Sequence, residues 1–261
     1  MRLAFSDVGS GPVVVLLHGF PLNRAMWDAQ IRALAPNHRV IAPDLPGHGE
    51  SPAPDGVYTM DEMADAVVAT LDELGVEGPV VVGGLSMGGY VALSMALNHQ
   101  SRVGALVLAD TRAAADTPAA AAKREETAQA VLRSGDVGPV VEGMLPRLFS
   151  QATFRERPGL VPPLKAAMEG TPPPGVVGAL RGMACRPDRR ERLKEISCPV
   201  LVAVGEDDAI SPRDEMKAIA DALGECRFVV VPAAGHLAPY ENPDAFNSAL
   251  LDFLRDFPLD A

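Results

Sequence analysis

The sequence is poor in cysteine, in aromatic residues and in long apolar runs, and each shortage excludes a class of protein. Only three cysteines, Cys185, Cys198 and Cys226, occur among 261 residues, and they form no C-x-x-C pair. Such an odd set predicts reduced thiols, mostly buried, and neither a disulfide framework nor a metal site. No apolar run approaches the length of a membrane span, and the first residues lack the apolar segment of a signal peptide. We therefore expect a soluble, cytoplasmic protein.

Positive charge is also scarce. The chain has 23 Lys and Arg against 34 Asp and Glu, and its formal net charge at pH 7 is −11. Because nucleic acids and many membrane surfaces are anionic, this balance argues against either as a partner. The remainder has ordinary globular composition, with 48% hydrophobic and 22% charged residues. A chain of this length is expected to bury roughly 75% of its surface.

Residues 79–90, PVVVGGLSMGGY, are the most informative stretch. The β-branched run at 80–82 predicts a buried strand, and the apolar residues 90–97 predict a helix. Between them, residues 84–88 match G-x-S-x-G and carry Ser86 at a strand-to-helix turn. A Cβ at either flanking glycine would crowd this sharp turn, and the helix N-terminus offers N–H groups to a developing oxyanion. The stretch therefore predicts a nucleophilic serine.

Strands and helices alternate on both sides of this turn. Further strands are predicted at 2–8, 13–17, 39–42, 103–109, 200–204 and 227–231, and further helices at 23–34, 59–74, 212–223 and 243–254. This alternation predicts an α/β fold, with a mostly parallel sheet flanked by helices.

The alternation stops between residues 111 and 195. This segment is helical in pattern, is interrupted by prolines and contains neither Trp nor Tyr. It has 14 Lys and Arg against 10 Asp and Glu, which leaves 9 against 24 for the rest of the chain. A basic segment over an acidic body would favour anionic substrates, although exposed helices commonly carry such charges for solubility alone. Because aromatics are few, any pocket here is expected to be aliphatic, with Met144, Leu145, Leu148, Met168 and Met183 as candidate lining residues.

Taken together, the motifs resemble those of the α/β-hydrolase fold family, in its branch of serine esterases, enol-lactonases and cofactor-free haloperoxidases. In addition to the G-x-S-x-G turn, the chain carries in family order LHGF at 17–20, DLPGHGES at 44–51, GEDD at 205–208 and AGH at 234–236. The resemblance covers residues 1–110 and 196–258. It implies an α/β-hydrolase core, formed by 1–110 and 196–261, and an inserted helical cap, formed by 111–195, over the active site.

A serine hydroxyl needs a base, and the base needs an orienting acid. His236, in the loop after the last strand, is the best candidate for the base. Asp208 occupies the family's position for the acid, which gives the order Ser86, Asp208, His236 expected of this fold. Two rivals for the acid remain open. Asp110 ends the preceding core strand, where some members of the family place the acid, and Asp207 is the neighbour of Asp208.

The resemblance also implies two backbone N–H donors for an oxyanion, those of Phe20 and Met87. His18 is a second candidate base, although a histidine beside a glycine more often braces a loop. Asp44 and His48 could form another acid–base pair, for which a hydrogen-bonded structural turn is the alternative.

These residues predict a carboxylic ester hydrolase that cleaves small esters or lactones through an acyl-enzyme and needs no cofactor or metal. Serine at position 86 disfavours the family's aspartate-nucleophile branches, the haloalkane dehalogenases and epoxide hydrolases. Acyltransferase, thioesterase or haloperoxidase-like activity on the same triad, or a ligand-binding module on a hydrolase scaffold, are the alternatives. The expected partner is the small-molecule substrate, and the sequence does not indicate an oligomeric state.

Overall fold

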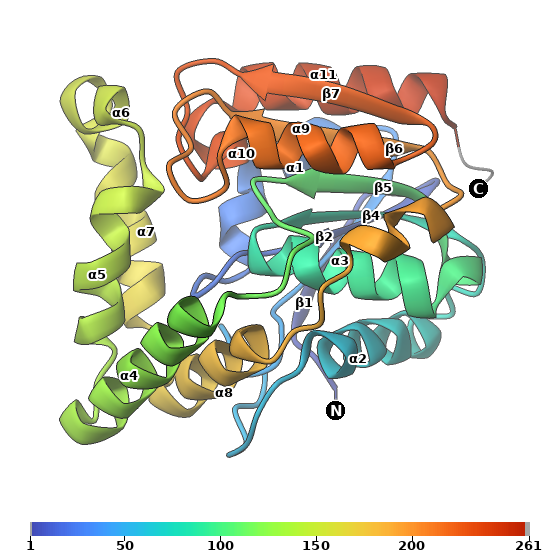
Figure 1. Cartoon of the computed structure of the whole chain (residues 1–261). Coiled ribbons are helices and arrows are strands. Elements are labelled where there is room, and N and C mark those ends of the chain that lie inside the picture. Colours follow the sequence, from blue (N-terminus) through green and yellow to red (C-terminus); the bar gives the residue numbers. More distant parts are fainter. Residues whose placement is uncertain (1, 259–261) are drawn as a thin grey trace.

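A seven-stranded sheet forms the centre of the molecule (Figure 1). The computed structural model describes residues 2–258. The strands are β1 (Phe5–Val8), β2 (Val13–Leu17), β3 (Arg39–Pro43), β4 (Val80–Leu85), β5 (Val103–Ala109), β6 (Val200–Gly205) and β7 (Cys226–Val231). They lie in the order β1-β3-β2-β4-β5-β6-β7, and all adjacent pairs are parallel except β1 with β3. The central strand β4, which leads to Ser86, is buried along its whole length.

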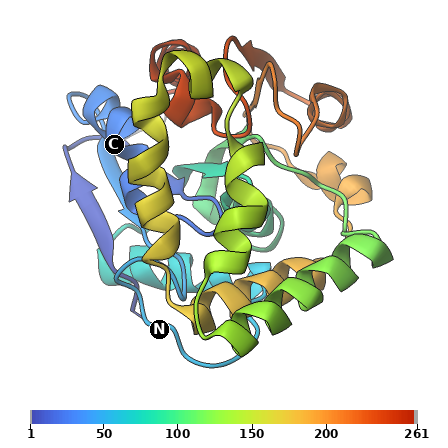
Figure 2. The same cartoon turned by 90° about the vertical axis from the view of Figure 1, so that its left-hand side faces the viewer.

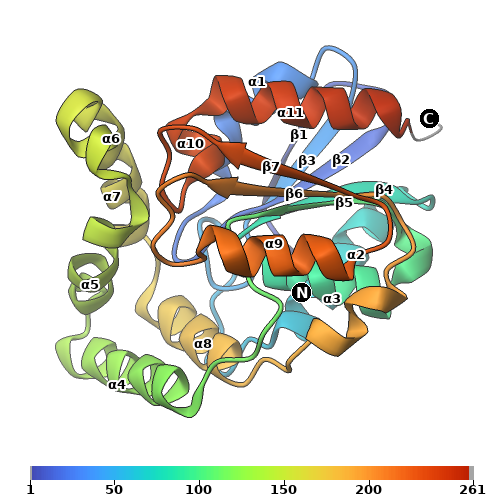
Figure 3. The ribbon, with the colours of Figure 1, turned by 45° about the horizontal axis from the view of Figure 1, so that its top comes forward.

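Helices cover both faces of the sheet. Figure 3 shows α1 (Asp28–Leu34) and α11 (Pro243–Asp256) on one face, and α2 (Met60–Glu73), α3 (Met87–Asn98) and α9 (Arg213–Ala222) on the other. The helix α2 begins at a capping box, in which the side chain of Thr59 accepts from the N–H of Glu62 and the side chain of Glu62 accepts from that of Thr59. The predicted mostly parallel sheet with flanking helices is confirmed.

The chain leaves the sheet between β5 and β6 and forms the helices α4 (Pro118–Ser134), α5 (Gly138–Leu148), α6 (Gln151–Glu156), α7 (Val161–Glu169) and α8 (Pro173–Ala184). Figures 1 and 2 show them as one group beside the sheet, in which α4 lies along α8 and α5 runs beside α7. Several prolines of this region stand in the first turns of α4, α5, α7 and α8, where a missing N–H costs no hydrogen bond, and Pro146 lies inside α5. The predicted helical insertion is thus present, and its boundaries as a separate unit stay a prediction.

Two short helices were not predicted. These are α6 and α10 (Ala238–Glu241), which are too short to display an apolar period. In α6, the side chain of Ser150 accepts from the N–H of Thr153 and so caps the helix. The helix predicted over 23–34 begins with a 3₁₀ segment at Arg24–Trp27, and α3 begins at Met87 rather than at residue 90.

The three cysteines differ in exposure, and the expectation of mostly buried thiols is wrong for one of them. Cys185 is exposed, whereas Cys198 and Cys226 are partly buried, and all three are free thiols. Burial raises the pKa of both Cys198 and Cys226 to about 11. No helix within residues 2–258 is long and apolar enough to span a bilayer.

Candidate active site

Ser86 stands at the turn between β4 and α3, in a backbone conformation with φ 52° and ψ −111° that few non-glycine residues adopt. Two hydrogen bonds with residues at the end of β5 hold Ser86 in this conformation. The Ser86 N–H donates to the Ala109 carbonyl over 3.0 Å, and the Thr111 hydroxyl donates to the Ser86 carbonyl over 2.7 Å. A Cβ on Gly84 would lie 2.2 Å from the carbonyl oxygen of Gly88. Glycine is therefore required in the motif because the backbone at Gly84 lies very close to the backbone at Gly88.

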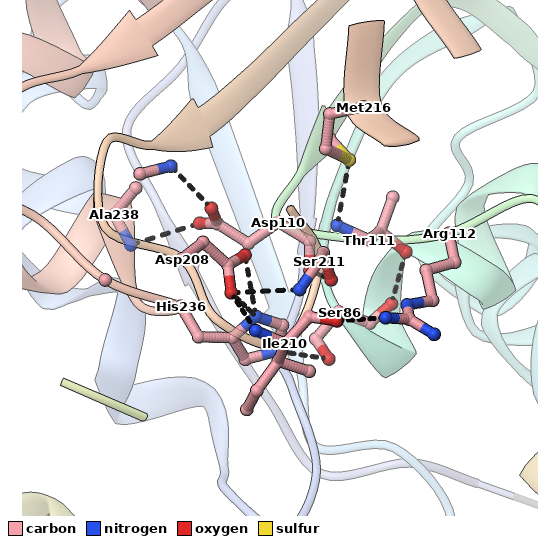
Figure 4. A network of polar contacts seen from close by, with 12 residues as sticks. Ser86, Asp110, Thr111, Arg112, Asp208, Ile210, Ser211, Met216, His236 and Ala238 are labelled. Carbon is pink, nitrogen blue, oxygen red and sulfur yellow. Dashed lines mark hydrogen bonds and ion pairs between the residues drawn. The ribbon is translucent and has the colours of Figure 1, made fainter. Parts of the chain in front are cut away.

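His236 bridges Ser86 and Asp208 (Figure 4). Its Nε2 lies 2.8 Å from the Ser86 Oγ, and its Nδ1 lies 2.9 Å and 3.1 Å from the two carboxyl oxygens of Asp208. The N–H groups of Ile210 and Ser211 donate to Asp208 Oδ1 over 2.7 and 2.9 Å. An ionised Asp208 requires Nδ1 to carry the proton, which leaves Nε2 free to accept one from the serine.

The rival acids have other surroundings. The Asp110 carboxyl is fully buried and accepts from the Gly205 N–H over 2.7 Å and from the Ala238 N–H over 3.1 Å, with no hydrogen bond to His236 (Figure 4). Asp207 is exposed. Of the three candidates, only Asp208 is within hydrogen-bond reach of the histidine.

The two buried carboxyl groups also differ in ionisation. Burial, reinforced by the negative charge of Asp208, raises the pKa of Asp110 well above its usual value. Burial acts in the same direction on Asp208, but the charge and hydrogen bond of His236 outweigh it and lower the pKa of Asp208. The charged form is therefore favoured beside the histidine and the neutral form at Asp110.

The two backbone N–H groups expected to bind an oxyanion come from different elements. Phe20 follows β2, and Met87 is the first residue of the twelve-residue helix α3. Within residues 2–258, neither N–H donates to a protein acceptor. The Met87 N–H also lies at the positive end of the helix dipole. The role of both groups as oxyanion donors stays a prediction.

His18 and His48 are fully buried, and neither ring forms a hydrogen bond with Ser86. His18 accepts from the Leu45 N–H over 2.9 Å at Nε2, and its Nδ1 lies 2.9 Å from the Gly19 carbonyl oxygen. Burial lowers the pKa of His18 to about 4 and that of His48 to about 3. Both rings are therefore neutral near pH 7 and brace the loops after β2 and β3.

Asp44 is part of a structural turn and is not paired with His48. Its carboxylate accepts from the N–H groups of Arg24 and Glu50 over 2.8 and 2.9 Å and forms an ion pair with the guanidinium of Arg24. His48 Nδ1 instead lies 3.0 Å from the carbonyl oxygen of Pro46. The arrangement is that of the hydrogen-bonded turn rather than of a second acid–base pair.

A cavity of about 500 Å³ opens over Ser86 and is lined by residues of the sheet edge and of the helices between β5 and β6. Of the aliphatic residues predicted to line it, Met144 and Met183 do so, whereas Leu145, Leu148 and Met168 do not. The wall is also more charged than expected. Its charged residues are Arg112, Asp116, Lys123, Arg124, Glu126 and Arg147.

Most of these charges are paired. Arg124 pairs with Asp116, Lys123 with Glu126 over 2.7 Å, and Arg112 with Glu215 over 3.0 Å. Although burial is the largest single influence on Asp116 and acts upward, the guanidinium groups of Arg124 and Arg186 together lower its pKa. Arg147 is exposed and, among the described residues, has no hydrogen bond or ion pair from its side chain. It is the cavity's uncompensated cation in the sense that, among the described residues, it alone of the four Lys and Arg side chains of the wall has no ion-pair partner.

Within residues 2–258, no group of three or more His, Cys, Asp and Glu side chains is placed so that it could hold a metal ion. Ser86 and the buried imidazole of His236 offer a hydroxyl beside a base.

The family model for the alpha/beta hydrolase fold matches residues 12–243. The chain belongs to the α/β-hydrolase fold family. It is similar to the structure of a malate-bound thermophilic esterase from Thermogutta terrifontis, with 46% identity, a TM-score of 0.96, and 98% of this chain and 94% of the other covered. A 3-oxoadipate enol-lactonase from Acinetobacter baylyi is 28% identical, over 94% of this chain and 90% of its own length.

A third relative is a pimeloyl-[acyl-carrier protein] methyl ester esterase from Vibrio atlanticus, 31% identical over 95% of this chain and 96% of its own length. Hydrolases of esters and lactones are therefore among the relatives of this chain. The expected membership of the α/β-hydrolase family is confirmed.

Sequence reasoning missed two polar side chains next to the site. Thr111 holds the Ser86 carbonyl, and Glu241 is 1% exposed and accepts from the Gly235 N–H over 2.6 Å, next to His236. Glu241 comes five residues after the histidine, but nothing in its immediate sequence distinguishes a buried carboxylate from a surface one.

Proposed function

We propose that this chain hydrolyses small carboxylic esters or lactones, with Ser86 as nucleophile, His236 as base and Asp208 as the acid that orients it. The observation that carries the proposal is the hydrogen-bonded series from Ser86 Oγ through His236 to Asp208, with distances of 2.8 and 2.9 Å, at the floor of a cavity. The ester- and lactone-cleaving relatives support the same reaction class.

In the first half of the reaction, Ser86 Oγ attacks the carbonyl carbon while His236 Nε2 takes the hydroxyl proton. The Asp208 carboxylate stabilises the resulting imidazolium through Nδ1. The N–H groups of Phe20 and Met87 donate to the oxyanion, and each such donor typically contributes about 3–4 kcal/mol to transition-state stabilisation. Collapse of the intermediate expels the alkoxide, which takes its proton from His236 Nε2.

In the second half, a water molecule attacks the acyl carbon of Ser86. His236 accepts a proton from this water, and the same two N–H groups hold the second oxyanion. The bond to Ser86 Oγ breaks, the serine regains its proton from the histidine, and the carboxylic acid leaves. His236 therefore accepts and returns each proton that moves during the cycle.

The cavity wall favours substrates with a second negative group. Arg147 is its uncompensated cation, because Lys123 and Arg124 are paired with carboxylates. The malate-bound Thermogutta relative, which holds a small dicarboxylate, supports the same preference. We therefore expect half-esters of small dicarboxylic acids to be better substrates than neutral esters of equal length.

The test is hydrolysis of p-nitrophenyl esters from acetate to decanoate by the wild type and by Ser86→Ala in parallel. We expect a rate maximum at one short chain length, set by the cavity, and loss of the enzymatic rate in the variant. Equal rates in both proteins, or none in either with lactones included, would reject the proposal. Product formation only in the presence of an added alcohol or thiol would instead identify an acyltransferase.

A further inference from the structure

A buried carboxylate outside the triad joins the His236 loop to the helical insertion. Glu241, the last residue of α10, is 1% exposed. Its Oε1 accepts from the Gly235 N–H over 2.6 Å, and its Oε2 accepts from the Ser150 N–H over 2.9 Å and from the Thr153 hydroxyl over 2.6 Å. One carboxylate thus holds the residue before the candidate base and the start of α6.

The same junction is reinforced by backbone and cationic contacts. The His236 N–H donates to the Leu148 carbonyl, at the end of α5, over 3.0 Å. Arg157 donates to the Ala233 carbonyl over 2.8 Å, to the Thr153 hydroxyl over 3.0 Å and to the backbone carbonyl of Glu241. The bond from Arg157 to Thr153 lies within the segment 148–157, and the others connect that segment with the loop or helix that flanks His236.

Close packing leaves this junction little freedom. A Cβ on Gly235 would lie 2.6 Å from the Ser150 nitrogen and 3.1 Å from Glu241 Oε1. Ala233, two residues earlier, has φ 53°, a conformation that costs a non-glycine residue of order 1–3 kcal/mol and persists only where its surroundings enforce it. The loop is therefore held from outside rather than by its own backbone preference.

We propose that Glu241 is a positioning residue, which fixes the His236 loop against residues 148–153 and so keeps His236 Nε2 within reach of Ser86 Oγ. A carboxylate suits this role because it only accepts, and three donors converge on it. A glutamine would turn an NH₂ group toward at least one of these donors. This inference rests on the proposed hydrolase function only for its kinetic readout.

The experiment compares Glu241→Gln and Glu241→Asp with the wild type, using p-nitrophenyl butyrate. Displacement of a catalytic group by about 1 Å can cost on the order of 100-fold in rate, so we expect kcat to fall about tenfold or more in both variants, with KM within about twofold. The aspartate keeps the charge but is one methylene too short to hold both sides. The downfield proton resonance of the His236 Nδ1–H, read by NMR without substrate, should broaden or shift.

Ser94→Ala is the matched control, because it removes another buried hydrogen bond, from Arg189 over 2.9 Å, remote from His236. It should lower Tm as Glu241→Gln does and leave both kcat and the resonance unchanged. A wild-type kcat in Glu241→Gln overturns the proposal. A wild-type kcat in Glu241→Asp also overturns it, because the negative charge at position 241, and not the contact with both segments, would then account for the rate. A wild type without esterase activity rejects the proposed function, while the resonance still tests the positioning role.

If Glu241→Gln does not fold, Thr153→Val provides the same test. It removes the hydroxyl that donates to Glu241 Oε2 and accepts from Arg157 and from the Ser150 hydroxyl, and it leaves the bond from Gly235 to Glu241 in place. We expect a loss of about threefold in kcat with KM retained, as expected for a partly loosened contact. An unchanged kcat in a folded Thr153→Val protein overturns the proposal.

Discussion

Two regions enclose the cavity, and they use their polar groups differently. At the edge of the sheet, Ser86, Asp110 and Ala233 adopt left-handed backbone conformations and buried carboxyls accept several hydrogen bonds each. Along the helices between β5 and β6, many charges instead form exposed ion pairs, such as Lys123 with Glu126 and Lys165 with Glu169. The first region therefore fixes the positions of its side chains, whereas the charged side chains of the second remain solvated.

This difference has an energetic consequence. A buried polar group left without its partner costs about 1–3 kcal/mol or more, whereas an exposed ion pair contributes about 0–1 kcal/mol. Substitutions at the sheet edge should therefore change activity by orders of magnitude, and those in the insertion by a few-fold.

The largest expected effect separates the two buried carboxyls. Asp208→Asn should lower kcat by about 10⁴-fold, because an amide presents a donor to His236 Nδ1 and favours the wrong tautomer. Asp110→Asn retains one acceptor for the backbone and should cost about tenfold, since Asp110 braces Gly205 and Ala238 rather than the histidine. Steady-state kinetics of the two variants decide the matter. A greater loss in Asp110→Asn would make Asp110 the acid.

A pair of glycines contrasts the regions in stability. Gly84→Ala places a Cβ 2.2 Å from the Gly88 carbonyl oxygen and should lower the free energy of unfolding by about 3 kcal/mol or more, if the protein folds at all. Gly143→Ala lies inside α5 with no atom within 4 Å of the new Cβ, and it should raise that free energy by about 0.5–1 kcal/mol. Urea unfolding of both proteins measures the difference. Equal destabilisation would contradict the contrast.

Acid should weaken the loops that His18 and His48 brace. The folded state lowers the pKa of His18 to about 4 and of His48 to about 3, by burial, so the unfolded chain binds more protons below its own value near 6.5. Stability is therefore full above about pH 6.5 and falls as the pH decreases, by roughly 3 kcal/mol at pH 4 from His18 alone. Urea unfolding from pH 7.5 to 5 should show this slope, and His48→Asn should reduce it. An identical slope in the variant would refute this origin.

The smallest effect concerns the uncompensated cation of the cavity. Arg147→Gln should raise KM about three- to tenfold for a p-nitrophenyl succinate half-ester and leave that for neutral p-nitrophenyl butyrate unchanged, since one partly solvated ion pair is lost. Lys165→Gln, which removes a charge outside the cavity wall, is the control. Equal changes for both substrates would argue against a binding role of the guanidinium.

The same two regions differ in how well the sequence predicts them. Residues 80–82 and 103–109 are apolar enough to predict buried strands, and G-x-S-x-G locates Ser86 because only glycine tolerates the approach to Gly88. Strand order and the carboxyl ends of parallel strands then bring Ser86, Asp208 and His236 to one edge. The local sequence is sufficient to predict the structure at positions where a single interaction dominates.

Other features depend on contacts between distant residues and could not be predicted. The decision between Asp110 and Asp208 depends on which carboxyl lies within hydrogen-bond reach of His236, and the burial of Glu241 depends on Ser150 and Thr153 of the insertion. The position of a short helix such as α6 is set by those contacts, and its sequence shows no helical periodicity of apolar residues.

Covalent labelling tests directly whether Ser86 is a nucleophile activated by His236. Wild type and His236→Ala are treated with a fluorophosphonate, and the modified peptide is located by mass spectrometry. We expect one label per chain, on Ser86, formed far more slowly in the variant because the serine has lost its base. Labelling at another residue, or at equal rates in both proteins, would show that Ser86 is not a nucleophile activated by His236.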